Sequence, residues 1–496
     1  MTAIGRRTVQ LWLAVILTST LSAQTGDEAA ARQLLDTGRA ALAAGKGPEA
    51  ATAFETIVTK YPGTSLADEA LLERARYQLD VQHDDKAAAG SIERLLADYA
   101  TSNSVPAGQV LRARLGLVES ASADQRKSAL ATLDRLANDF AGTEVAADAL
   151  FRAAEASDAA GTSDALNRFT ELAARYPGMP IVADGLLHAA ALQASAGESL
   201  KAMDTLQRVR ARYPRTPAAA VALNQLTILH RLYLRAPAVA VFGYTRSVGG
   251  SAGKIKDFRD LLVNRDNHLL VATRNAVTEF GAAGEVVGTR QAPETEAAFN
   301  DAQDRLFTIH DKGVIRGDGR SPLALATARS NGRVEPIDID AAAALSSGDL
   351  IVANRSQKTL MRFSADGRPK GEIAKAIGAR RLAVSQQDNV AALDVDQRTV
   401  TILARDGRVL GRVVERGAAY QLRQPVDVAF DALGHLYVLD RAAIYVFTTR
   451  GDRLLATFAS PDKTAGAFSN AQSLALDAAG RLYIYESRNE VVQVYQ

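Results

Sequence analysis

Apolar residues follow a helical spacing from Gln24 to about Arg235. Ala-rich segments such as ARQLLDTGRAALAAG place small apolar residues three and four apart, which marks one face of a helix. A Pro, Gly, Ser or Thr turn follows each such segment, and Pro and Gly end helices. An aromatic residue closes five of the segments, 36 to 41 residues apart: Tyr61, Tyr99, Phe140, Tyr176 and Tyr213. The pattern predicts a repeat of helical hairpins over residues 24–235.

From about Lys256 the period changes to the two-residue alternation of strands. Six β-rich runs recur, with first apolar residues 37 to 46 apart: Leu269, Leu306, Leu350, Val390, Leu436 and Leu482. A short apolar strand precedes each run, and a third strand with a Gly-containing turn follows it. This period is that of a four-stranded unit, so we expect a six-bladed β-propeller over residues 257–496.

The last unit of this repeat ends after its third strand. Residues 236–256 join the two halves as a Gly- and Ser-containing linker, and they include the apolar stretch AVAVFGYTR at 238–246. We expect Val239 to Tyr244 to supply the missing fourth strand, because closing the ring removes two bare sheet edges. The predicted fold class is therefore multidomain α and β: an N-terminal α-solenoid followed by a six-bladed propeller.

The helical half resembles the tetratricopeptide repeat (TPR) family, in which a Gly, a small Ala, an aromatic residue and a Pro recur at fixed offsets. The second and third repeats depart from the pattern, because they lack the Pro and have Ile92 and Leu133 at the aromatic position. The residues that match the family pattern are Gly38, Ala50, Phe54 and Pro62 in the first repeat, Ala165, Phe169 and Pro177 in the fourth, and Ala202, Leu206 and Pro214 in the fifth.

The YPGT-type ending of these repeats is similar to that of envelope proteins such as the outer-membrane assembly factor BamD and the Tol-Pal-associated periplasmic coordinator. The β-rich half resembles NHL-type propellers through its D-x-x-G and L-Y-V-x-D segments. The resemblance of the helical half implies binding of protein or peptide partners along a curved inner surface.

The first 23 residues have the layout of a secretory signal peptide. Arg6 and Arg7 precede an apolar run that extends to Leu21, and small residues surround Ala23. The alternative is a membrane anchor, but the run is interrupted by polar residues and is short for a spanning helix. No Cys follows, which excludes an N-terminal lipid anchor. We expect cleavage after Ala23, no membrane span in the mature chain, and a periplasmic or secreted location.

Composition narrows the possible functions. The chain has 496 residues, too many for one core, and no Cys, which excludes disulfides, zinc–thiolate sites and a cysteine nucleophile. Without Arg6 and Arg7 it carries 56 basic and 56 acidic residues. This neutral balance argues against nucleic acid as a partner.

Three sets of polar residues are candidates for chemistry. Arg208, Arg210, Arg212 and Arg215, with Arg231 and Arg235 nearby, could bind an anion, but a solvated helix face is the commoner use of such a run. His268 and His435 precede core strands, so we expect them to be exposed. The fifth residue of each core strand is polar and could ring a cation, although such residues more often hydrogen-bond the following turn: Thr273, His310, Asn354, Asp394, Asp440 and Glu486.

These observations predict no catalytic residue, no cofactor site and no metal site. We expect a non-enzymatic scaffold that binds protein partners of the cell envelope through the helical groove and the propeller face. One alternative is a metal-dependent propeller lyase or hydrolase that uses His310 and Asp440 and is localised by its helical half. A second alternative is a propeller that binds a glycan or cell-wall ligand.

Overall fold

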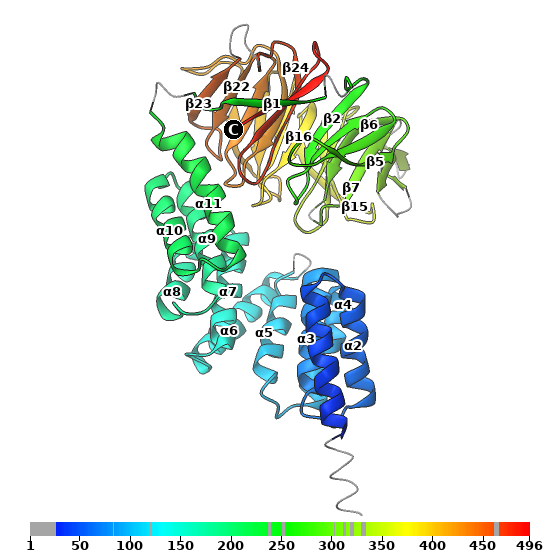
Figure 1. Ribbon diagram of the computed structural model, residues 1–496, viewed down its shortest axis with the longest axis vertical. Coiled ribbons are helices and arrows are strands. Elements are labelled where there is room, and N and C mark those ends of the chain that lie inside the picture. Colours follow the sequence, from blue (N-terminus) through cyan, green and yellow to red (C-terminus); the bar gives the residue numbers. More distant parts are fainter. Residues whose placement is uncertain are drawn as a thin grey trace, which may run out of the picture. The chain divides into compact units, whose positions relative to one another are not determined.

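The computed structural model shows a helical region followed by a β-propeller-like domain (Figure 1). It describes residues 26–496 except 83, 119–120, 237–239, 250–252, 302, 311–313, 318–321, 329–333 and 461–465. The chain divides into two compact units, one ending at Gly185 and the other spanning Leu186–Gln496. The predicted signal peptide lies outside the described residues. None of the helices in the described ranges has the length and apolar character needed to cross a membrane.

The helices form antiparallel hairpins. A first helix covers residues 26–43. It is followed by α2 (Gly47–Lys60), α3 (Ala67–Tyr77), η1 (Gln78–Gln82), α4 (Asp85–Asp98), α5 (Val105–Leu115), α6 (Ala123–Asp139), α7 (Glu144–Ala159), α8 (Ala165–Arg175), α9 (Ile181–Ser195), α10 (Ser199–Arg212), α11 (Pro217–Leu229) and η2 (His230–Leu234), where η1 and η2 are π-helical turns.

The five repeated aromatic residues end helices, as predicted. Each one is the C-cap of the second helix of a repeat hairpin, at the ends of α2, α4, α6, α8 and α10. The residues expected to fill the space between helices are fully buried, including Ala50, Phe54 and Phe169. Ile92 and Leu133 are buried in the same way. Aliphatic side chains therefore fill the aromatic position in the two divergent repeats.

The strands of the β domain form six four-stranded antiparallel sheets and one small hairpin. Five sheets are each made of four consecutive strands: β2 (Phe258–Val263), β3 (Leu269–Thr273), β4 (Ala276–Phe280) and β5 (Val286–Gln291); β6 (Thr295–Asn300), β7 (Leu306–His310), β8 (Val314–Gly317) and β9 (Leu323–Ala324); β12 (Ile339–Ala344), β13 (Leu350–Asn354), β14 (Thr359–Phe363) and β15 (Pro369–Lys375); β16 (Ala379–Val384), β17 (Val390–Asp394), β18 (Thr399–Leu403) and β19 (Val409–Val413); β20 (Pro425–Phe430), β21 (Leu436–Asp440), β22 (Ala443–Phe447) and β23 (Leu454–Ala459). The hairpin is β10 (Ala326–Ala328) and β11 (Val334–Pro336).

The remaining sheet combines both ends of the β domain. It contains β24 (Ala471–Leu476), β25 (Leu482–Glu486) and β26 (Val491–Tyr495), and β1 (Tyr244–Gly249) pairs antiparallel with β26. The structure thus has five blades that are each built from one continuous segment, whereas the sequence predicted six blades. The predicted linker does supply the additional strand, but this strand starts at Tyr244, the last residue of the predicted range Val239 to Tyr244, and Val239 lies outside the described residues. Just before this strand, Gly243 exchanges two backbone hydrogen bonds with Gln496.

All six core strands begin at the residues predicted from the sequence. The turn before each core strand contains one residue with positive φ, a conformation that Gly, Asn and Asp adopt most readily. These residues are Asn267, Asp304, Gly348, Asp388, Gly434 and Gly480. Where the residue is not Gly, its side chain accepts a backbone hydrogen bond from the turn of a neighbouring sheet. The D-x-x-G pattern therefore marks the turn, and an Asn or Asp at the Gly position adds a contact between sheets.

The innermost strands form a closed ring. β2, β6, β12, β16, β20 and β24 contact one another in this order, and β24 also contacts β2. Apolar clusters fill the space between neighbouring sheets, and the one between the composite sheet and β2–β5 includes Val248, Leu261 and Tyr483. Asn267 Oδ1 accepts the backbone N–H of Ala478 across the same junction. Both ends of the domain thus hold the ring together.

The end of the helical segment contacts the β domain within the second unit. Arg231 donates to the backbone carbonyl of Gly480 at 2.6 Å, and Tyr233 Oη lies 3.1 Å from His435 Nε2. Asp431 Oδ2 lies 2.8 Å from His435 Nδ1. The prediction that His435 is exposed was wrong, since only 1% of its surface is exposed. These contacts lie at the turns that join inner strands to core strands.

Candidate functional site

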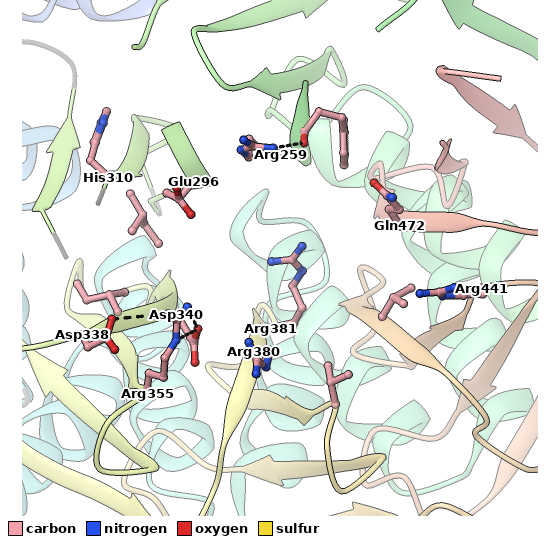
Figure 2. Close-up of a pocket in the computed structure, with 15 residues that line it drawn as sticks. Arg259, Glu296, His310, Asp338, Asp340, Arg355, Arg380, Arg381, Arg441 and Gln472 are labelled. Carbon is pink, nitrogen blue, oxygen red and sulfur yellow. Dashed lines mark hydrogen bonds and ion pairs between the residues drawn. The ribbon is translucent and has the colours of Figure 1, made fainter. Parts of the chain in front are cut away.

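A cavity lies at the end of the ring opposite to these turns, where inner strands begin and core strands end. Its volume is about 460 Å³. Figure 2 shows its polar side chains converging from several sheets. The lining residues are Phe258, Arg259, Glu296, Ile309, His310, Asp338, Ile339, Asp340, Arg355, Arg380, Arg381, Val395, Val426, Arg441 and Gln472.

A β-bulge in every inner strand builds this lining. The register with the core strand shifts by one residue near the start of each inner strand, which leaves one residue without a partner. A bulge reorients the extra side chain and ends regular pairing. The six extra residues all line the cavity: Arg259, Glu296, Asp340, Arg380, Val426 and Gln472.

One wall of the cavity is acidic. Glu296, Asp338 and Asp340 lie there together with His310 (Figure 2). Arg355 neutralises part of this wall, because its Nε donates to Asp340 Oδ1 at 2.7 Å. Its Nη1 lies 4.0 Å from Asp338 Oδ1. His310 is buried, and its Nε2 lies 2.8 Å from the hydroxyl of Thr308.

The other side of the cavity is basic. Arg380, Arg381 and Arg441 gather there, with Arg259 above them in the view of Figure 2. The only ion pair of Arg380 within the described residues is a long one, 3.9 Å to the exposed Asp396. Arg441 forms none in that part of the chain. Several guanidinium groups thus face the cavity with little compensation from the protein.

A buried charged cluster forms the floor beneath the basic side. Arg381 Nε lies 3.7 Å from Asp427 Oδ1, and this nitrogen makes no hydrogen bond within the described ranges. Asp427 accepts hydrogen bonds from Ser473 Oγ at 2.7 Å and from the backbone N–H of Leu474 at 2.9 Å. Asp260 accepts the backbone N–H groups of Leu261 and Ala298 at 2.9 and 3.2 Å.

Burial and like charge shift the acidity of this floor cluster. Burial and, less strongly, the neighbouring Asp260 raise the pKa of Asp427 to about 6, although Arg381 favours its charged form. Burial also raises the pKa of Asp260, again against Arg381. Burial by itself would lower the pKa of Arg381, but the two carboxylates keep it above its usual value. The single guanidinium group of Arg381 therefore stabilises the charged forms of two buried carboxyl groups, Asp260 and Asp427.

Among the described contacts, four of the six polar residues that end core strands bind the following turn, as the commoner use of such residues predicted: Thr273, Asn354, Asp394 and Glu486. Asp440 instead binds the segment before the inner strand of its own sheet. Asp440 accepts the backbone N–H groups of Arg423 and Gln424 at 2.7 and 2.6 Å. Asp394 binds Gly378 and Gln397. Glu486, Thr273 and Asn354 also bind groups in adjoining turns. Among the six, only His310 lines the cavity, so His310 and Asp440 do not share a site.

The other candidates also have clear positions. Within the described residues, no group of three or more His, Asp or Glu is arranged to hold a metal ion. Arg208, Arg210, Arg212 and Arg215 are exposed on α10 and the turn after it, as a solvated face requires. Arg231 does not belong to that face, because it binds Gly480 and lies over the ring of Phe242. His268 is half-buried, 2.8 Å from Glu279.

Among the cavity residues, sequence reasoning singled out His310 alone. The signal was present, because the second and third residues of the inner strands include charged groups within otherwise apolar runs, as in FRDLL, ARRLA and PVDVA. Alternation alone directs only one of two adjacent residues toward the axis. The bulge brings both to the cavity or its floor, and bulges carry no reliable sequence mark.

Comparison with known proteins gives partial matches. The tetratricopeptide repeat model matches residues 184–216. No curated protein matches the chain. Among solved structures, a gluconolactonase from Xanthomonas campestris is 15% identical, with 51% of this chain and 98% of that chain covered at a TM-score of 0.36. A streptogramin B lyase is 8% identical, with 51% and 97% covered at a TM-score of 0.37.

A putative gluconolactonase is 12% identical, with 52% of this chain and 93% of that chain covered at a TM-score of 0.37. The likeness to BamD and the Tol-Pal-associated coordinator has no support among these matches. The chain combines a tetratricopeptide repeat with a β-propeller-like domain.

Proposed function

We propose that this protein is a non-enzymatic interaction scaffold of the cell envelope, in which the helical repeats bind a protein partner and the β domain binds a second ligand. In this proposal the composite sheet acts as the sixth blade of the ring. The mature chain starts at Gln24 and works in the periplasm or outside the cell.

The observation that carries the proposal is the pairing of two repeat scaffolds in one chain. Stacked helical hairpins present long surfaces for protein binding. Large apolar side chains are exposed on the second unit's helices, with 67% of Leu200 and 46% of Leu223 accessible. We therefore choose these two leucines as probes of the proposed partner-binding surface.

In-cell photo-crosslinking tests the scaffold. A photoreactive amino acid at Leu200 or Leu223 should capture one reproducible protein, identified by mass spectrometry. The same amino acid at Val286, an exposed valine of β5, is the matched control and should not capture that protein. If no helical position yields an adduct that β5 does not also yield, the scaffold proposal loses its support.

Cell fractionation tests the location. Processing after Ala23 gives a mature chain that begins with Gln24, which N-terminal sequencing of the purified protein detects. Recovery of the unprocessed chain in the cytoplasmic fraction would contradict an envelope function.

The axial cavity favours a small polar molecule as the ligand of the β domain. Its lining contains five arginines, three carboxylates and one histidine, and charged groups converge this way in ligand sites more often than on inert surfaces. A thermal-shift screen with small polar compounds should raise the unfolding temperature of the wild-type protein, and Arg441→Gln should reduce the effect. A rise that Arg441→Gln and Arg259→Gln both leave unchanged would place binding elsewhere.

A further inference from the structure

We propose that the axial cavity binds a small oxyanion-bearing molecule, and that binding draws a proton onto the Asp260–Asp427 pair because the anion and both carboxylates compete for Arg381. This inference rests on the proposed ligand-binding function of the β domain. It names the chemical class of the ligand and the way in which pH regulates its affinity.

The basic side of the cavity supplies the anion site. Arg259, Arg380 and Arg441 face the cavity, and their compensation by protein carboxylates is a single 3.9 Å ion pair between Arg380 and Asp396 within the described residues. Guanidinium groups bind carboxylate, sulfate and phosphate oxygens through paired N–H donors. An oxyanion therefore gains several charge-assisted hydrogen bonds at this wall.

The acidic wall limits the rest of the ligand. Glu296, Asp338 and Asp340 would repel a second anionic group, and only Arg355 neutralises them. Carboxylates accept hydrogen bonds from hydroxyl and amino groups. We therefore infer a ligand with an oxyanion at one end and hydroxyl or amino donors at the other, small enough for a cavity of about 460 Å³.

Arg381 connects the cavity to the floor. Its side chain retains 28% exposure, lines the cavity and extends toward the centre of the view in Figure 2. Its buried Nε has no hydrogen-bond partner among the described residues, and Asp427 Oδ1 is 3.7 Å away. An anion in the cavity gives this guanidinium a closer partner than Asp427.

The charged groups around the floor come from several inner strands. Asp427 lies on β20, Arg381 on β16 and Asp260 on β2. Asp340 on β12 also acts on Arg381 electrostatically but is paired with Arg355. β24 contributes the neutral Ser473 and Gln472, and His310 on β7 lines the opposite wall.

The sign of the coupling follows from these charges. An anion near Arg381 weakens the stabilisation of both carboxylates and adds negative charge beside them, so it favours their protonated forms. The pKa of Asp427 is already about 6. Above pH 6, binding of the anion is therefore accompanied by uptake of a proton. The affinity for the anion then falls as pH rises, by up to about tenfold per pH unit for one proton.

Calorimetric titration of the full-length protein with sulfate tests the proposal. Sulfate keeps its double charge between pH 5 and 8, so any pH dependence comes from the protein. Titrations at pH 7 in two buffers with different ionisation enthalpies count the protons taken up. We expect uptake approaching one proton for the wild type, with affinity at pH 6 several-fold above that at pH 7.5.

Variants separate the anion site from the proton site. Arg441→Gln should weaken sulfate binding at every pH, whereas Arg208→Gln, an exposed arginine of α10, should leave it unchanged. Asp427→Asn and Asp260→Asn should each reduce proton uptake. Two variants are used so that the test still works if one of them does not fold. His310→Gln should retain the uptake.

The outcomes are distinct. Sulfate binding without proton uptake would overturn the coupling and leave the ligand site standing. Uptake that survives both Asp variants but disappears in His310→Gln would overturn the assignment to the floor cluster. No detectable sulfate binding, or binding indifferent to Arg441→Gln and Arg259→Gln, would overturn the anion site itself.

Discussion

Gly38 permits a close approach between the first two helices. A methyl group at this position would lie 2.5 Å from Cε1 of Phe54, which is fully buried and has little room to move. Gly38→Ala should therefore lower the free energy of unfolding by about 1–3 kcal/mol, measured by denaturant titration. Gly90→Ala in α4 is the matched control, because no atom lies within 4 Å of its added methyl group. That control should gain about 0.5–1 kcal/mol, and an equal loss at both sites would refute the packing argument.

Asp427 makes stability depend on pH in an unusual direction. Its pKa is about 6 in the folded chain, against an ordinary value of 3.8. Between these values the folded protein retains a proton that the unfolded chain has lost, so this group lowers the free energy of unfolding as pH rises from 4 to 6. Asp427→Asn should remove this contribution and flatten the decline, as measured by thermal melts across that range. Asp266→Asn, at an exposed aspartate, should keep the wild-type slope.

At the scale of elements, β1 joins the predicted linker to the β domain. Val248 of β1 is buried against the cluster that includes Val492 and Tyr483. Val248→Asp would bury an unpaired charge there, and we expect a loss of at least about 3 kcal/mol in the free energy of unfolding. Val286→Asp provides the control, because Val286 also lies on an outer strand but is 61% exposed. Similar effects of the two changes would mean that β1 does not stabilise the ring.

At the scale of the whole molecule, the last helices belong to the same compact unit as the β domain. Arg231 and Tyr233 bind turns of that domain, and Ile228 approaches Gly480. A fragment of residues 178–496 should therefore unfold cooperatively. A fragment of 236–496, which loses these contacts and uncovers His435, should unfold about 5–10 °C lower in calorimetry. Equal unfolding temperatures would show that the helical segment contributes nothing to the domain.

Much of the architecture follows from local rules that the sequence displays by itself. Helix ends lie at Tyr61 and its counterparts because turn-forming Pro, Gly, Ser or Thr residues follow each of them. Core strands begin at Leu269, Leu436 and their equivalents because tight turns need Gly, Asn or Asp at positive φ. Asp394 was expected to bind the following turn for a similarly local reason, and it accepts the backbone N–H of Gln397.

Only the tertiary structure decided which distant residues meet. The burial of His435 depends on Tyr233, two hundred residues earlier, and Gly243, just before β1, pairs with Gln496. The cavity depends on a bulge repeated in every inner strand, and its floor joins Asp260, Arg381 and Asp427 from three sheets. Periodicity specifies which face of an element is apolar, but closure of the ring determines which polar side chains share one axis.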